Sequence, residues 1–362
     1  MKNIPEYDIW TYLSHTKLPI VMYGMGNGAD KILSVCNNLD IEICDFFAND
    51  GFVRGHMFHG KTVLTYSQIK EKYTRFIVLL SFATSLDNVL ESIKKIDSDP
   101  CCELYAPDVP VCGNTLFDMN FYNQHKAEIE KVYSLLCDEK SKEIYCDIIS
   151  FKLSAKISYL IKHEFSSDEL FNSILKLKNC TSYTDLGAYN GDTIKELLTY
   201  ADKLQKIVAF EPDRRNFAKL ASFAETIKAP IIKTYQLGAW DKETTLYFDG
   251  SGNRNANLIT TDSISGKKLT ETHVNSLDNI LSGEETDYIK YDVEGAEKEA
   301  ILGSQKTIAN HLPKLNISVY HRSEDIFSLP LMIHEMFPQY KLYLRKKNYI
   351  PAWDITLCCT TD

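Results

Sequence analysis

The sequence contains no C-x-x-C pair, no uninterrupted hydrophobic run of eighteen residues and no excess of basic residues. Without C-x-x-C, the ten cysteines form no obvious zinc cage, and their scatter along the chain predicts reduced, mostly buried thiols. Because Pro5 interrupts a polar N-terminus and no signal peptide is evident, we expect no membrane insertion and a cytoplasmic location. A net charge of −9 argues against a nucleic-acid partner, which requires a basic surface.

The best-defined pattern that is present spans residues 183–213, where a short strand, a glycine-containing turn, a helix and a second strand follow one another. Glycines at 187 and 191 let the backbone turn sharply and approach a ligand closely. Asp185 closes the first strand, and Glu211 closes the second, 24 residues after the first of these glycines. A carboxylate at that offset can accept hydrogen bonds from a ribose, and an acid beside the loop favours a cationic ligand over a pyrophosphate.

Five ordered segments then give the chain a family resemblance: DLGAYNGDT, AFEPD, LGAWD, IKYDVEGAE and SVYHR. The first resembles motif I of class I S-adenosylmethionine-dependent methyltransferases. All five together resemble the FkbM family, over a region from about Thr115 to the C-terminus. The resemblance implies a Rossmann-like α/β domain with a seven-stranded sheet, whose antiparallel sixth and seventh strands are YKLYLRKKNY and DITLCCT, and S-adenosylmethionine as the cofactor.

The resemblance also assigns individual residues to the cofactor. In such domains the loop after the third strand lines the adenine, which here nominates Gly238, Ala239 and Trp240, although a buried core position explains Trp240 equally well. The full set implied for the cofactor is Asp185, Gly187, Ala188, Tyr189, Gly191, Asp192, Thr193, Glu211, Pro212, Gly238, Ala239, Trp240 and Asp292.

Acidic residues and a histidine follow two later strands. Asp292 and Glu294 lie two apart at the C-terminal end of the expected strand DYIKYDV, at the edge of the sheet where ligands bind, and they point toward the same face if extension continues. Glu297 is better explained as a first-turn acid favoured by the helix dipole. His321 follows KLNISVY, and a neutral imidazole there suits a general base for a sugar-like hydroxyl. The sequence leaves open whether His321, Asp292 or Glu294 is the base, or whether the two carboxylates hold Mg²⁺.

A second, smaller α/β unit precedes these motifs. The segments LPIVMY, IEICDFF and FIVLLSF alternate with helical stretches in a Rossmann-like βαβαβ pattern. Its glycines at 24, 26 and 28, with Asp45 and Asp50, are compatible with a nucleotide or sugar nucleotide, but a packing or dimerisation domain is the stronger alternative. Prolines near residue 110 mark a linker. We expect domains at 1–115 and 181–362, joined by a helical connector at 116–180.

Three further segments carry weaker expectations. Apolar residues between 123 and 161 form two helical stripes, and Ser167 is expected to cap another helix. The basic residues 345–347 are expected at a solvated hairpin tip. The polar segment 249–268 is typical of a loop, which would contact an acceptor sugar through Asn253, Asn255 or Asn257.

These observations predict an S-adenosylmethionine-dependent O-methyltransferase that acts on a hydroxyl of a sugar, glycan or related small molecule. Two alternatives from other classes stay open. In one, the N-terminal unit binds a nicotinamide nucleotide and the protein is a sugar-modifying oxidoreductase. In the other, the protein is a non-catalytic nucleotide-binding module, which the intact acidic and glycine positions disfavour. The expected partner is a small-molecule or glycan acceptor, and a homodimer is compatible with the N-terminal unit.

Overall fold

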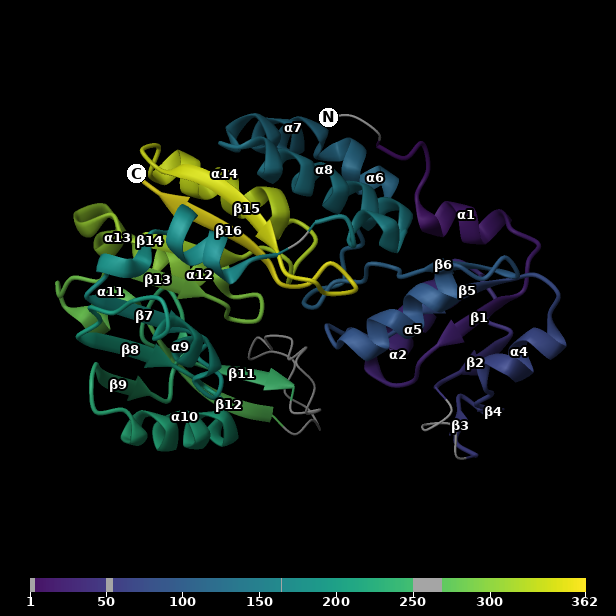
Figure 1. Ribbon diagram of the computed structural model, residues 1–362, viewed down its shortest axis with the longest axis horizontal. Helices are drawn as coiled ribbons and strands as arrows, with labels where there is room; N and C mark the ends of the chain where they lie inside the picture. Colours follow the sequence, from purple (N-terminus) through teal and green to yellow (C-terminus); the bar gives the residue numbers. More distant parts are fainter. Residues whose placement is uncertain (1–3, 50–54, 164, 250–268) are drawn as a thin grey trace.

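The computed structural model describes residues 4–49, 55–163, 165–249 and 269–362. Figure 1 shows two α/β lobes, with helices α6, α7 and α8 lying between and above them. The smaller lobe is built on a four-stranded parallel sheet in the order β2-β1-β5-β6. Its elements are α1 (Ile9–His15), β1 (Ile20–Tyr23), α2 (Asn27–Asn38), β2 (Asp45–Phe47), β3 (Met57–Phe58), β4 (Lys61–Thr62), α4 (Tyr66–Lys72), β5 (Phe76–Leu80), α5 (Asp87–Asp97) and β6 (Cys102–Tyr105).

The apolar runs of the N-terminal sequence explain this sheet. Every residue of β1 and β5 is buried, as expected for central parallel strands with both faces covered. Helix α4 begins at a capping box in which Thr65 and Gln68 each bond the other's backbone N–H. The βαβαβ pattern expected from the sequence thus forms a small parallel sheet.

The connector that follows packs against the larger lobe. Its elements are α6 (Met119–Gln124), α7 (Lys126–Leu135), α8 (Glu139–Ser154), η1 (Ile157–Tyr159), η2 (Glu169–Ile174) and η3 (Leu177–Asn179). The two apolar stripes lie on α7 and α8, and Leu136 forms a bridge with Leu342. The expected cap at Ser167 is wrong, because η2 is a π-helix and the hydroxyl of Ser166 accepts the N–H of Glu169. Ser167 instead donates to the carboxylate of Glu196.

The larger lobe contains a seven-stranded sheet in the order β15-β16-β14-β13-β7-β8-β9. All its strands run in one direction except β16, which is antiparallel to both neighbours. A separate three-stranded sheet has the order β10-β12-β11. The elements are β7 (Ser182–Leu186), α9 (Asp192–Leu197), β8 (Lys206–Phe210), α10 (Arg214–Thr226), β9 (Ile231–Tyr235), β10 (Gly238–Ala239), β11 (Thr244–Asp249), β12 (Leu269–Asn275), α11 (Leu277–Leu281), β13 (Tyr288–Tyr291), α12 (Glu297–Leu302), α13 (Gln305–His311), β14 (Lys314–Ser318), α14 (Asp325–Met336), β15 (Lys341–Lys346) and β16 (Ile355–Thr360).

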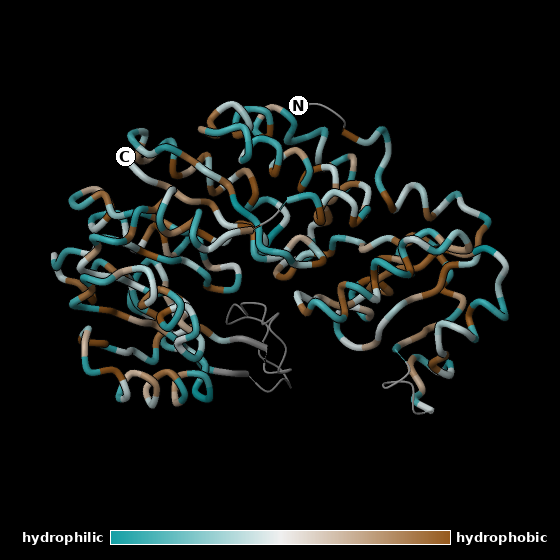
Figure 2. The backbone as a smooth tube through the Cα atoms, viewed as in Figure 1, coloured by the Kyte–Doolittle hydropathy of each residue, from teal (hydrophilic) through white to brown (hydrophobic). Residues whose placement is uncertain are grey.

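One hydrophobic core continues from the smaller lobe through the connector into the larger sheet. Figure 2 shows hydrophobic segments along the central strands of both lobes. The boundaries expected near residues 115 and 180 fall between elements, since β6 ends at Tyr105, α6 begins at Met119, η3 ends at Asn179 and β7 begins at Ser182. Among the helices of the described ranges, none has the length and apolarity needed to cross a membrane.

The lobes meet directly at a backbone bridge, and the linker between them is held by a buried ion pair. Thr84, after β5, exchanges both backbone hydrogen bonds with Ile350 in the β15–β16 loop. Lys152 of α8 forms a buried ion pair with Asp108 of the linker, with 2.7 Å between Nζ and Oδ2. The end of the smaller sheet therefore lies beside the loop that precedes β16.

Candidate functional site

The glycine loop after β7 packs directly on the end of β13. Gly187 has a φ of +85°, and a Cβ added there would lie 1.8 Å from the carbonyl oxygen of Asp292. Gly191 has a φ of +89°, and a Cβ there would lie 2.5 Å from the ring of Phe223. Both positions therefore require glycine for conformation and for space. The loop between them carries Ala188, which is buried, and Tyr189, whose side chain is exposed.

Glu211 is held against this loop. It follows β8, and its two carboxylate oxygens accept the N–H groups of Tyr189 and Asp213, each at 2.9 Å. Burial raises the pKa of Glu211 to about 7, because the backbone hydrogen bonds only partly offset the loss of water. Pro212 is next in the chain and lies beside Gly238 of β10, since a Cβ on that glycine would be 3.9 Å from the Pro212 side chain. Two segments expected to bind the cofactor are thus neighbours.

The remaining residues expected at the cofactor lie close in the chain to these. Ala239 is buried in β10, and Trp240, which is partly exposed, donates its N–H to the carbonyl of Asn275. Asp192 and Thr193 form the first turn of α9, directly after the loop. Their roles toward a cofactor stay predictions.

Asp185 does not present the free negative charge that the sequence suggested, because Lys290 pairs with it. The carboxylate is fully buried in β7, and its Oδ1 lies 3.3 Å from Nζ of Lys290, the residue opposite it in β13. The same ammonium lies 3.3 Å from the carbonyl oxygen of Gly187 and 3.5 Å from Asp292. Burial lowers the pKa of Lys290, but the two aspartates outweigh burial and raise it above the usual value. Sequence reasoning missed this lysine, although a charged residue in the apolar strand YIKY was a signal.

Beyond Lys290, the structure brings together Asp292, Glu294, Glu297 and His321, which we call the acid–histidine cluster. Asp292 and Glu294 both reach the cluster, but not because the strand continues: β13 ends at Tyr291, and Glu294 has a φ of +54° in a tight turn. Nε2 of His321 lies 3.7 Å from Oδ1 of Asp292 and 3.6 Å from Oε2 of Glu294. Ser318, the last residue of β14, donates a 3.0 Å hydrogen bond to Asp292.

Glu297 is part of this cluster, which corrects its interpretation as only a first-turn acid. It does begin α12, yet it is buried, with 1% of its side chain exposed. Its Oε1 lies 2.9 Å from Nδ1 of His321 and accepts the N–H groups of Val293 and Gly295. The turn between β13 and α12 thus wraps around one carboxylate that faces the imidazole.

The sequence suggested a neutral imidazole at His321, but in the structure the ring is protonated at neutral pH. Burial lowers its pKa, but Glu297, Asp292 and Glu294 outweigh burial and raise the pKa to about 9. The same interactions act on Asp292: burial raises its pKa, whereas Lys290 and His321 bring the pKa below the usual value. A protonated ring cannot act as a base, so the expected role of His321 as a neutral general base does not fit this arrangement.

The linker from the smaller lobe crosses the acid–histidine cluster. Cys112 donates its N–H to the carbonyl of His321 at 2.8 Å and its Sγ–H to the carbonyl of Glu294 at 2.9 Å. Arg322 donates to the carbonyl of Gly295 at 2.9 Å. Lys31 of α2 anchors the same linker by donating to the carbonyls of Pro110 and Val111. The connection between the lobes is therefore in contact with the cluster.

The glycine loop of the smaller lobe is explained mainly by packing. A Cβ on Gly28 would lie 2.1 Å from the carbonyl oxygen of Ser81, and one on Gly24 would lie 2.6 Å from the Phe82 ring, while Gly26 has open space around it. Asp45 begins β2, at the opposite end of the sheet from these glycines, and bonds Lys72 and Tyr73. Its expected role at a nucleotide is therefore wrong.

Some residues with expected binding roles lie outside the part of the chain that the structure describes. Asp50 of the smaller lobe lies outside the described residues. So do Asn253, Asn255 and Asn257, which were expected at an acceptor sugar.

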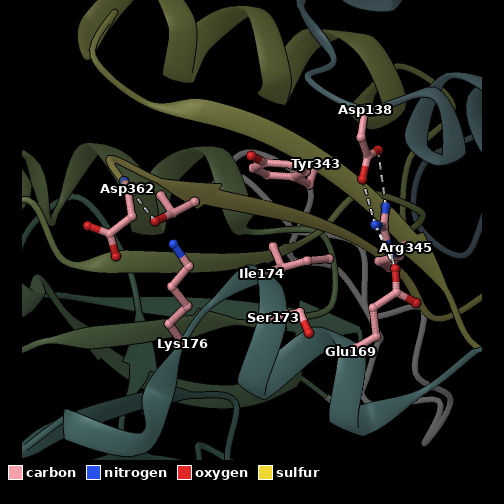
Figure 3. Close-up of a pocket in the computed structure, with 9 residues that line it drawn as sticks. Asp138, Glu169, Ser173, Ile174, Lys176, Tyr343, Arg345 and Asp362 are labelled. Carbon is pink, nitrogen blue, oxygen red and sulfur yellow. Dashed lines mark hydrogen bonds and ion pairs between the residues drawn. The ribbon is translucent and has the colours of Figure 1, made fainter.

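A pocket of about 290 Å³ lies at the edge of the larger sheet, away from the cluster. Figure 3 shows Arg345 of β15 reaching Asp138 and Glu169 there. Arg345 is 5% exposed, and its Nη2 lies 2.7 Å from Asp138 and 2.8 Å from Glu169. Arg345 and Lys346 are buried in β15, so the solvated hairpin tip expected at 345–347 is wrong for these two residues. β16 and β14 separate β15, which carries Arg345, from β13, where the acid–histidine cluster begins. The ion pairs of Arg345 therefore stabilise the fold and do not belong to the cluster.

Comparisons with known proteins give one family model and several similar folds. A family model for the methyltransferase FkbM domain matches residues 185–351. Among solved structures, a methyltransferase FkbM from Methylobacillus flagellatus KT is similar at a TM-score of 0.74 and 20% sequence identity, covering 98% of this chain and 94% of that one. A putative methyltransferase from Streptococcus mutans in complex with SAH is 13% identical, with a TM-score of 0.34 over 53% of this chain and 94% of that one. No curated protein matches the sequence.

Proposed function

Residues 185–351 belong to the FkbM methyltransferase family, and from this premise we propose that the protein methylates a hydroxyl of a sugar, glycan or related small molecule with S-adenosylmethionine. One observation carries the proposal. The glycine loop and Glu211 adjoin the acid–histidine cluster at the carboxyl ends of β7, β8, β13 and β14, because Gly187 packs on the carbonyl of Asp292. Ligands of open α/β sheets bind at that edge.

The residues around the glycine loop fit the proposed cofactor. A side chain at Gly187 or Gly191 would collide with the fold, so only glycine allows the loop this conformation, close to the end of β13. Each carboxylate oxygen of Glu211 accepts one backbone N–H and keeps capacity for a ribose hydroxyl. When bound, S-adenosylmethionine would supply a methyl group on a cationic sulfur. The bond between the methyl carbon and sulfur would break as the acceptor oxygen forms its bond to that carbon.

The acid–histidine cluster would position the acceptor and take its proton. Asp292 is 31% exposed and Glu294 is 53% exposed, so both can be reached from solvent, whereas His321 and Glu297 are buried. Alignment of oxygen, methyl carbon and sulfur supplies most of the rate enhancement in such a displacement. The hydroxyl proton would pass to a carboxylate of the cluster, and the products are a methyl ether, S-adenosylhomocysteine and a proton. However, the lowered pKa of Asp292 makes it a weak base.

Neither alternative from the sequence is favoured by a specific observation. Tyr66 and Lys70 have the Tyr-x-x-x-Lys spacing that a nicotinamide-dependent oxidoreductase can use. Both side chains bond Asp99, at 3.1 Å and 3.3 Å, just before β6 begins, which places them at the end of the small sheet away from the glycine loop.

Labelled methyl transfer tests the proposal. The protein is incubated with methyl-labelled S-adenosylmethionine and a panel of nucleotide sugars and free glycans, and label in the acceptor is measured. We expect at least one acceptor to be labelled, and Asp292→Asn to lower kcat by about 10²-fold. Glu225→Gln, which changes an exposed carboxylate of α10, serves as the matched control and should leave kcat unchanged. Equal kcat for Asp292→Asn and the wild type would remove Asp292 from the proposed chemistry.

A further inference from the structure

We propose that the acid–histidine cluster binds one divalent metal ion through Nε2 of His321 and the carboxylates of Asp292 and Glu294, with Glu297 fixing the imidazole ring. The proposal starts from spacing. Nε2 lies 3.7 Å from Asp292 and 3.6 Å from Glu294, too far for hydrogen bonds. Each distance is shorter than the combined length of two metal–ligand bonds of about 2.1 Å each. One ion can therefore bind the nitrogen and either oxygen.

An unpartnered nitrogen points to a ligand at this place. The side chain of His321 is fully buried, and neither ring nitrogen makes a hydrogen bond, although Nδ1 faces Oε1 of Glu297 at 2.9 Å. Oε2 of Glu297 is likewise buried without a hydrogen-bond partner. Most buried polar atoms in folded proteins have partners, so three atoms without a hydrogen bond in one cluster, Nδ1 and Nε2 of His321 and Oε2 of Glu297, require an explanation. Asp292, Glu297 and His321 each offer a ligand atom, and these atoms lie within 4.8 Å of one another.

The opposite side of the ring has the support that metal-binding histidines have. Nδ1 lies 2.9 Å from Oε1 of Glu297, and that oxygen is itself fixed by the N–H groups of Val293 and Gly295. A carboxylate that holds the second nitrogen of a histidine sets the ring orientation and leaves the first nitrogen for the metal. The backbone of His321 is held too, because its carbonyl accepts the N–H of Cys112.

Charge also favours a cation here. Among the described residues, Asp185 and Asp292 pair with Lys290, and Asp292, Glu294 and Glu297 lie within 4 Å of a ring nitrogen of His321. An imidazole that binds a metal through Nε2 gives up its proton, so a divalent ion would supply positive charge in its place. One imidazole with two carboxylates suits Mn²⁺, Zn²⁺ or Fe²⁺ better than Mg²⁺, which prefers oxygen ligands and water. We therefore propose a transition metal ion here in preference to the Mg²⁺ considered from the two carboxylates alone.

The consequence for chemistry rests on the proposed methyl transfer, but the site itself does not. An ion at Asp292 and Glu294 would bind the acceptor oxygen and lower the pKa of the hydroxyl, so that even a weakly basic carboxylate could take its proton. The exposed position of Glu294 leaves room for that oxygen.

Binding of Mn²⁺, followed by electron paramagnetic resonance, tests the site. Full-length protein is freed of metal with a chelator, and free Mn²⁺ is measured during titration, without cofactor or acceptor. We expect one saturable site per chain, with Kd at least tenfold weaker in Glu294→Gln and in His321→Gln. Glu225→Gln should match the wild type. Competition by Zn²⁺ and Mg²⁺ then ranks the ions.

Folding and function are separated by two further readings. Circular dichroism checks each variant, and Glu294→Gln keeps the test valid if the buried His321→Gln does not fold, because Glu294 is 53% exposed. Binding of S-adenosylhomocysteine is measured on the same samples. Absence of a stoichiometric Mn²⁺ site, or equal Mn²⁺ affinity in wild type and Glu294→Gln, overturns the metal site even where S-adenosylhomocysteine still binds.

Discussion

Lys290 decides the charge distribution of the site. Its ammonium lies between Asp185 and Asp292 and also contacts the carbonyl of Gly187, so one side chain links the glycine loop to the acid–histidine cluster. The sequence suggested that Asp185 faces a cationic ligand. In the structure a cation of the protein already occupies that position, which leaves Glu211 as a carboxylate that bonds the backbone of the glycine loop without a cationic partner in the described part of the chain.

Gly187→Ala tests whether the loop must touch β13. The added Cβ would lie 1.8 Å from a backbone oxygen at a φ of +85°, so both conformational strain and a collision oppose it. Gly283→Ala is the matched control, because Gly283 has a φ of +90° with open space around it. We expect the control to lose about 1 kcal/mol in urea denaturation and Gly187→Ala to lose about 3 kcal/mol or more. Equal losses would show that the collision is relieved at little cost.

The raised pKa of Glu211 predicts pH-dependent cofactor binding. Ribose hydroxyls donate to the ionised carboxylate, and a pKa of about 7 means that Glu211 is mostly protonated at pH 6 and mostly ionised at pH 8. The affinity for S-adenosylhomocysteine should therefore rise roughly tenfold between these pH values and then level off. Calorimetry at several pH values measures this. Glu211→Gln should bind weakly at every pH, and a flat profile for the wild type would contradict the role of Glu211.

At the scale of elements, the sequence predicted the strands and the turns between them well. The motifs at 183–213 and 288–297 combine apolar runs with glycine turns, and these local signals place β7 and β8 directly before their turns, whereas β13 ends at Tyr291, before the end of the expected strand. The sequence did not predict contacts between residues that are far apart in the chain. Arg345 looked like part of a solvated tip because its partners, Asp138 and Glu169, are about 200 residues away in the chain. The charge on His321 was missed because Asp292, Glu294 and Glu297 come near its ring only when the turn after β13 packs beside the end of β14.

Arg345→Met tests the ion-pair group on β15. Removing the guanidinium leaves Asp138 and Glu169 facing each other beside a buried strand, and both carboxylates are partly exposed, which moderates the penalty. We expect a loss of about 2 kcal/mol in the free energy of unfolding. Lys131→Met, which removes an exposed pair with Glu335, should cost almost nothing. Binding of S-adenosylhomocysteine should survive in both, and its loss in Arg345→Met would connect this group to the cofactor site.

For the whole molecule, the linker connects the two lobes at the cluster. Cys112 bonds the backbone of Glu294 and His321, and Lys31 of the smaller lobe holds the two preceding residues. No sequence pattern predicted these contacts of the linker, because the linker has no regular secondary structure and the contacts are made to backbone carbonyls. The smaller lobe therefore contributes to the geometry of the site even though its own glycine loop is packed.

Lys31→Met should loosen this linker. Burial lowers the pKa of Lys31, and its ammonium is stabilised by two carbonyl oxygens at 2.7 Å and 2.9 Å, which methionine cannot bond. Limited proteolysis should cut the variant faster between residues 106 and 118. Lys94→Met on the exposed face of α5 is the control. Identical cleavage rates in that segment would show that Lys31 does not restrain it.

The central claim is that the larger lobe binds S-adenosylmethionine at the glycine loop and Glu211. Calorimetric titration of the full chain with S-adenosylhomocysteine, and separately with NAD, tests it most directly. We predict one site per chain for S-adenosylhomocysteine, at least tenfold weaker binding in Glu211→Ala, and no binding of NAD. No heat of binding with S-adenosylhomocysteine, or a Glu211→Ala variant that binds like the wild type, would contradict the claim.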